Sequence, residues 1–394
     1  MDQGMQNYQC ACGNTVFYDN SQCVACGKDL GFCPTCRNIV SLLSDGSGQY
    51  TCGNLNCGAA LAKCQNYAEH NVCNRCVTAD AAGSLCDCCR FNDTIPDLTV
   101  AGNWEKWRLL ESAKRRLFYD LDELGLPYGK ASDQVNPPLT FDFKADVIPG
   151  KNFWRSMGKG KVERVYTGHA AGRITINIKE ADDVEREKLR VDFGEAHRTL
   201  IGHFRHEIGH YYWDQLVKGR REDECREVFG DHDSPTYAEA LERYYKDGAP
   251  ADWAQRHVSA YATMHPWEDF AETWATYLDM ISGLDTAQHV GFGGETEPIE
   301  ADVDDMVKRY QQLGIALNEV NRSMGLLDVV PEIFVDPVVV KLRFIHQLVR
   351  AGRAENGALG GQPPVVADTV AASADAPSAN GQGVVTAGVA GPPQ

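Results

Sequence analysis

Two histidines separated by three residues are the strongest chemical signal in the chain. His206-Glu207-Ile208-Gly209-His210 follows the pattern HExxH. In a helix, residues four apart project from one face, so His206 and His210 can bind one zinc ion while Glu207 lies beside them. Zinc lowers the pKa of a bound water molecule, and the neighbouring carboxylate can remove its proton. The pattern therefore predicts metal-dependent hydrolysis, with Glu207 as the base.

A third ligand is expected, because catalytic zinc sites use three protein ligands and leave one position open. Glu268 and Glu272 lie downstream on a helix predicted to begin after Pro266, and both face the same way because they are four residues apart. We predict Glu268 as the ligand and Glu272 as the acceptor that orients a ligating histidine. The opposite assignment of the two acids stays open. Asp214, four residues after His210, is predicted to orient that histidine.

Hydrolysis of an amide also needs a donor to the oxygen that becomes negatively charged in the transition state. Tyr261 and His265 directly precede the predicted Glu268 helix and are the candidates for that donor. A packing role is the alternative for each of them. His203, one turn before His206, competes as a ligand, although a buried, hydrogen-bonded histidine is the better interpretation.

The cysteines form a separate group of candidate ligands. Fourteen of the 15 lie between Cys10 and Cys89, many in CxxC-like pairs, and such thiolates are typical zinc ligands. Closed four-thiolate sites are structural, so we expect two to three structural zinc ions beside one catalytic ion. Rubredoxin-like iron is the alternative metal. The predicted sites are Cys10, Cys12, Cys23 and Cys26; Cys33, Cys36, Cys52 and Cys57; and Cys64, Cys73, Cys86 and Cys89, with Cys76, Cys88 and His70 competing at the third.

The elements that position these residues divide the chain into three parts. Residues 1–91 form a Cys-rich zinc-ribbon module, residues 92–352 a domain with its own core, and residues 353–394 a disordered tail of Gly, Ala and Pro. The predicted fold class is α+β, with many helices and a small sheet. Apolar spacing predicts a strand in the extended segment 173–179, a helix that carries HExxH, and helices over 103–124 and near 235–247, 267–281, 300–323 and 338–352.

Composition excludes several classes of protein. The 394 residues are 43% hydrophobic and 24% charged, which is typical of globular proteins and excludes wholesale disorder. A net charge of −17 argues against broad binding to nucleic acid. No apolar stretch is long enough for a membrane span, and the N-terminus lacks the features of a secretory signal. We therefore expect a cytoplasmic protein, where cysteines stay reduced; the oligomeric state is not predicted.

Together, these motifs resemble those of the bacterial zinc-binding metallopeptidases with an N-terminal zinc-ribbon region. The resemblance covers about residues 5–325 and implies a zincin-like domain of the gluzincin type, with zinc held by His206, His210 and a downstream Glu, and Glu207 as catalytic base. The helix of that Glu is also similar to the one in the lethal-factor group, where a Tyr seven residues before the ligand assists; that position is Tyr261. The shared segments are FNDTIPDL (91–98), NWEKWRLLESAKRRL (103–117), GHFRHEIGHYYWD (202–214) and SAYATMHPWEDFAETWATYLD (259–279).

Two positions depart from the family pattern. Ser282 and Asp279 stand where an Asp and a His, respectively, are expected after the Glu helix, so no role is carried over to them. The predicted function is zinc-dependent hydrolysis of peptide bonds in peptides or proteins. One alternative is a catalytically silent scaffold whose ribbons bind a protein or nucleic-acid partner, and another is hydrolysis of a non-peptide amide. The intact Glu207 favours an enzyme, because a silent scaffold does not need the base.

Overall fold

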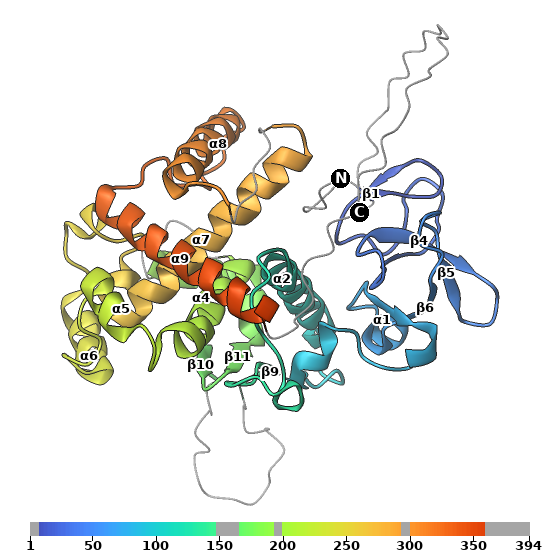
Figure 1. The fold of residues 1–394 in the computed structure, drawn as a ribbon, viewed down its shortest axis with the longest axis horizontal. Coiled ribbons are helices and arrows are strands. Elements are labelled where there is room, and N and C mark those ends of the chain that lie inside the picture. Colours follow the sequence, from blue (N-terminus) through green and yellow to red (C-terminus); the bar gives the residue numbers. More distant parts are fainter. Residues whose placement is uncertain (1–7, 147–164, 193–198, 293–299, 359–394) are drawn as a thin grey trace, which may run out of the picture. The chain divides into compact units, whose positions relative to one another are not determined.

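The protein has an α+β fold, which confirms the predicted class (Figure 1). The computed structural model describes residues 8–146, 165–192, 199–292 and 300–358. Its helices are α1 (Gln65–His70), α2 (Asn103–Glu123), α3 (Asp183–Asp192), α4 (Leu200–Tyr212), α5 (Glu222–Phe229), α6 (Tyr237–Asp247), α7 (Pro266–His289), α8 (Val303–Ser323) and α9 (Asp336–Ala358).

The strands form small sheets. In the Cys-rich region, β1 pairs with β2, and β3 to β7 form an antiparallel sheet in chain order. A separate sheet has the order β10-β11-β9-β8. The strands are β1 (Tyr8–Gln9), β2 (Thr15–Val16), β3 (Leu30–Phe32), β4 (Ile39–Ser44), β5 (Tyr50–Cys52), β6 (Ala60–Lys63), β7 (Cys76–Thr78), β8 (Asn92–Thr94), β9 (Thr140–Lys144), β10 (Gly168–Ala170) and β11 (Arg173–Asn177).

The second sheet packs against the helix that carries HExxH. Strand β11 runs parallel to β9 and places Ile174 opposite Phe141 and Ile176 opposite Phe143. These four side chains are fully buried. Phe204 of α4 packs on both phenylalanines, with ring centroids 5.9 and 6.2 Å apart. The buried face of the predicted strand therefore supports α4.

The strand is shorter than the extended segment predicted over 173–179. It ends at Asn177, whose side chain accepts the backbone N–H of Lys179 at 3.0 Å and begins a 3₁₀ turn over Ile178–Ala181. An Asn side chain that bonds a nearby backbone N–H in this way offers the chain an alternative to the sheet.

Most predicted helices lie where the apolar spacing places them, and the differences have local causes. Helix α7 continues past residue 281 to His289. Gly283 lies inside this extension, where α7 packs closely against α8. A Cβ at this position would lie 3.0 Å from the ring of Tyr310 in α8, so the glycine permits the two helices to pack together. Helices α3 and α5 were not predicted from the sequence, because they are short and highly charged.

Helix α9 runs past the predicted start of the tail at residue 353 and ends at Ala358. One tertiary contact explains the extension, because the side-chain amide of Asn356 donates to the carbonyl of Gly125 at 3.1 Å. The remainder of the predicted disordered tail, residues 359–394, lies outside the described residues. No helix in the described part of the chain is long and apolar enough to cross a membrane.

The Cys-rich region packs against α2. The hydroxyl of Tyr18 donates to the carbonyl of Arg115 at 3.0 Å, and the guanidinium of Arg115 donates to the carbonyl of Val72 at 2.7 Å. Arg37 forms an ion pair of 2.9 Å with Asp122. The main hydrophobic core extends from the cysteines of this region into the later helices, so the two regions share buried surface.

Candidate active site

Helix α4 carries the HExxH motif and begins at a defined cap. The side chain of Thr199 accepts a backbone N–H of the first turn at 3.0 Å, which satisfies one of the free donors there. Phe204 and Ile208 are fully buried and fix one side of the helix in the core. His206 and His210 lie one turn apart and face α7.

Glu268 lies on α7, opposite the two histidines. Its Oε2 is 3.0 Å from Nε2 of His206 and 3.4 Å from Nε2 of His210, and the two Nε2 atoms are 3.1 Å apart. Three ligand atoms about 2.0–2.1 Å from one zinc ion in tetrahedral geometry would be about 3.3–3.4 Å from one another. The three donor atoms therefore fit a single zinc ion, and Glu268 is the acid that faces both histidines.

The two helices come this close because Gly209, inside the motif, has no side chain. A Cβ at this position would lie 3.0 Å from Cα of Ala271 and 3.0 Å from Cβ of Trp274. Non-bonded carbons normally pack at about 3.5–4.0 Å. Gly209 therefore allows a close approach between the helix of the histidines and the helix of Glu268.

Glu272 has a different task from Glu268, although both face the same way. Its Oε1 lies 2.6 Å from Nδ1 of His206, and its Oε2 accepts the hydroxyl of Ser259 at 2.6 Å. Burial alone would raise the pKa of Glu272, but the hydrogen bonds of His206 and Ser259 hold the pKa below its usual value. An ionised Glu272 thus accepts the Nδ1 proton of His206 and leaves Nε2 free for a metal.

Asp214 does not orient His210, so that prediction is corrected. Its carboxylate lies 3.5 Å from the ammonium of Lys218, and Nδ1 of His210 has no hydrogen-bond partner in the described part of the chain. The reason is that the chain widens into a π-helical turn over Trp213–Val217, which breaks the spacing that would stack Asp214 above His210. The indole of Trp267 instead stacks on the His210 imidazole, with centroids 3.6 Å apart.

Glu207 is buried, with 7% of its surface exposed, and the charges of His206 and Glu268 act on its carboxyl group. Its Oε2 has no hydrogen-bond partner among the residues described. Burial raises the pKa of Glu207 to about 7, and the nearby charge of His206 opposes that rise. A buried carboxylate oxygen without a donor is costly and requires an explanation. A water molecule on a bound metal would supply the missing donor.

The two predicted oxyanion donors occupy different environments. The ring of Tyr261 lies beside His206, with centroids 6.1 Å apart. Burial raises the pKa of Tyr261, and the charge of Glu268 raises it further, so its hydroxyl stays protonated. His265 is buried and caps α7, because its Nδ1 accepts the backbone N–H of Trp267 at 3.1 Å. The structure thus shows His265 as a helix cap and Tyr261 beside His206.

Tyr237 is a residue of this site that the sequence did not reveal. Its hydroxyl donates to Oε1 of Glu268 at 2.8 Å, and its ring packs edge-on against Trp267 and His265. Tyr237 opens α6, directly after the capping residue Thr236. The number of residues between HExxH and α6 does not indicate that Tyr237 lies near the histidines. The sequence indicates only that Tyr237 lies at the start of a predicted helix.

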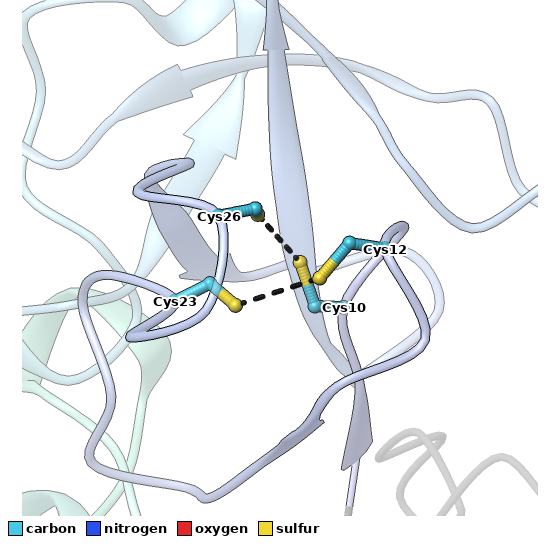
Figure 2. A group of neighbouring side chains, drawn as sticks. All are labelled: Cys10, Cys12, Cys23 and Cys26. Atoms are coloured by element: carbon cyan, nitrogen blue, oxygen red, sulfur yellow. Dashed lines mark hydrogen bonds between the residues drawn. The ribbon is translucent and has the colours of Figure 1, made fainter.

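The cysteines converge in groups of four, and Figure 2 shows the first, formed by Cys10, Cys12, Cys23 and Cys26. The sulfurs of Cys10 and Cys26 are 3.6 Å apart, and those of Cys12 and Cys23 are 3.7 Å apart. Four sulfurs about 2.3 Å from one zinc ion would be about 3.8 Å from one another. The second group is Cys33, Cys36, Cys52 and Cys57, and the third is Cys64, Cys73, Cys86 and Cys89.

The third group resolves the alternatives that the sequence left open. Cys73 and Cys86 have sulfurs 3.8 Å apart, and the four ligand atoms lie within 4.8 Å of one another. Cys76 and Cys88 are buried outside this group. His70 packs against Trp107, with ring centroids 5.4 Å apart. None of the three competing residues belongs to the third group.

Comparison with known proteins agrees with this geometry. Residues 103–348 match the model of a family described as "Putative zinc-binding metallo-peptidase", and residues 7–100 match a zinc-ribbon domain. The chain belongs to this metallopeptidase family. An uncharacterized protein of Mycobacterium bovis and its counterparts in two strains of Mycobacterium tuberculosis are each 36% identical over 354 residues, covering 88% of this chain and 95% of the relative. No solved structure gives a significant match.

The two matched ranges contain different groups of the candidate site residues. The family match contains His206, His210 and Glu268, and the zinc-ribbon match contains the three cysteine groups. Zinc is therefore the metal that both matches support. The match that contains HExxH covers α2 to most of α9, so the helices that bring the donor atoms together lie within the family domain.

Proposed function

We propose that this chain is a zinc-dependent peptidase that hydrolyses peptide bonds in peptides or proteins. Its catalytic zinc would be held by His206, His210 and Glu268. The observation that carries this proposal is the triangle of donor atoms, 3.0, 3.1 and 3.4 Å apart, together with the buried Oε2 of Glu207, which has no hydrogen-bond partner among the described residues. The triangle fits one zinc ion, and the family match supports zinc binding and peptidase chemistry.

Bound zinc would supply a Lewis acid that lowers the pKa of a water molecule and polarises the substrate carbonyl. Glu207 would then act as the general base, taking the water proton on Oε2 as the oxygen attacks the carbonyl carbon, and later giving a proton to the leaving amine. Its burial supports this role, because Oε2 has no donor among the described residues and can therefore accept that proton.

Other side chains would position the reacting groups. Glu272 orients His206 through Nδ1, and Ser259 holds the other oxygen of Glu272. We propose Tyr261 as the donor to the developing oxyanion, because its protonated hydroxyl belongs to a ring packed beside His206. A donor that strengthens its bond as negative charge develops lowers the barrier more than it tightens substrate binding.

The cysteine groups would each hold a structural zinc ion, which makes three beside the catalytic ion. Each group offers four thiolates and so leaves no open position for a substrate. All 15 cysteines are free of disulfides, and thiolate sites of this kind need a reducing compartment. On that ground we propose a cytoplasmic location.

A digest of a peptide library by the full-length chain tests the function. Glu207→Gln should lower the rate by about 10²–10⁴, because it removes the base and keeps the shape of the side chain. Its zinc content and melting temperature should stay close to those of the wild type. The matched control is Glu224→Gln, the same change at an exposed position of α5, which should keep full activity. Unchanged cleavage by Glu207→Gln would refute the mechanism and favour a silent scaffold, and a wild type that cleaves no peptide would refute the substrate class.

A further inference from the structure

A tyrosine from another helix donates a hydrogen bond to the oxygen of Glu268 that does not face the histidines. Its Oε2 faces the histidines, whereas Oε1 accepts the hydroxyl of Tyr237 at 2.8 Å. The Glu268 side chain is only 3% exposed, so water has little access to it. Tyr237 is therefore the donor that satisfies the oxygen turned away from the histidines.

Tyr237 has little freedom to leave this position. It is the first residue of α6, and Thr236 before it exchanges hydrogen bonds with Glu239 in a reciprocal cap. Its ring packs edge-on against Trp267 at 5.7 Å and against His265 at 5.4 Å, measured between ring centroids. Both partners belong to the start of α7, as Glu268 does. The cap and the two rings thus fix the hydroxyl relative to Glu268.

This arrangement decides how Glu268 can bind a metal. A carboxylate with one oxygen engaged by a donor offers the other oxygen alone, whereas a free carboxylate can turn and bind through both oxygens. Binding through both would occupy the position that a catalytic zinc ion must keep open. Loss of the hydroxyl would also leave Oε1 buried without a donor, which is costly.

We propose that Tyr237 is a positioning residue that keeps Glu268 a one-oxygen ligand and thereby strengthens zinc binding at the HExxH site. The inference rests on the proposed function only in taking His206, His210 and Glu268 as zinc ligands.

The test measures zinc affinity, which needs no substrate. The full-length Tyr237→Phe variant is dialysed against zinc buffered by a competing chelator, and the number of zinc ions bound per chain is measured. A variant with both His206→Ala and His210→Ala gives the amount of zinc bound outside the HExxH site, which is subtracted. Tyr237→Phe should bind zinc about 10–100-fold more weakly at this site, the usual effect of removing a partner of a ligand. Tyr245→Phe, the same change at a residue of the same helix that is 68% exposed, should keep wild-type affinity.

A double-mutant cycle separates positioning from a folding defect. In the Glu268→Ala background, Tyr237→Phe should cause no further loss of affinity, because the hydroxyl no longer has its acceptor. A loss of the same size in both backgrounds, or an affinity of Tyr237→Phe within twofold of the wild type, would overturn the proposal. An inactive wild type would remove the peptidase assignment and leave this zinc result standing, so the two failures are distinguishable.

Discussion

Replacing Gly209 by alanine should weaken the metal site while the fold persists. This glycine separates Ala271 and Trp274 of α7 from α4, and an added Cβ would lie 3.0 Å from a carbon atom of each. Because both neighbouring atoms belong to or adjoin the backbone of α7, a side-chain rotation cannot relieve the contact. The helices themselves have to separate.

The size of the effect follows from these distances. To reach ordinary carbon–carbon contact, the helices must open by about 0.5 Å. His206 moves with α4 and Glu268 moves with α7, so the 3.0 Å separation of their donor atoms lengthens. Metal–ligand distances tolerate only about 0.2 Å, so we expect zinc affinity to fall about tenfold or more. The added methyl group overpacks the contact between α4 and α7, which costs about 1–3 kcal/mol. The better helix propensity of alanine offsets about 1 kcal/mol of this cost, so the free energy of unfolding should fall by up to about 2 kcal/mol.

Equilibrium dialysis and thermal unfolding of the full chain measure both quantities. The control is Gly357→Ala in α9, where an added Cβ meets no atom within 4 Å. It should leave zinc affinity unchanged and keep or slightly raise the melting temperature, since alanine is the better helix former. If Gly209→Ala behaved like this control in both measurements, the close approach at Gly209 would not be what holds the metal site together.

Two further predictions concern metal loss and the oxyanion donor. A mild chelator should abolish activity and leave most of the helical circular dichroism, because α4 and α7 are packed through buried apolar side chains such as Phe204, Ile208 and Trp274 and do not depend on the metal for their core; loss of the whole helical signal at the same concentration would contradict this. Tyr261→Phe should lower kcat by about 10²–10³ with KM and zinc content little changed. His265→Ala should lower kcat less, because His265 caps α7, and the reverse ranking would move the donor role to His265.

The sequence by itself determined the features that depend on local periodicity. A helix places residues four apart on one face whatever surrounds it, so the HExxH pattern was enough to predict that His206 and His210 project together. The short spacing of cysteine pairs acts in the same way, because nearby thiols on a turn stay close in any fold. Helix α2, which carries a strong apolar stripe, also lies within a residue of its predicted range.

The predictions from sequence failed where the structure departs from a regular local pattern. The spacing between His210 and Asp214 suits an α-helix, but the wider turn that begins at Trp213 breaks it. The end of α9 depends on the contact of Asn356 with Gly125, a residue far away in the chain. Neither event leaves a repeated pattern in the sequence, because each depends on a few specific contacts.

Only the tertiary structure decided which acid faces the histidines and which side chain holds it. Glu268 and Glu272 share a helix face, so periodicity cannot distinguish them. Their roles depend on where α7 crosses α4, and Gly209 sets that crossing through the space it leaves. Tyr237 reaches Glu268 from a third helix, α6. Distances between helices result from side-chain packing across the core, and for that reason the spacing of residues along the chain could not predict them.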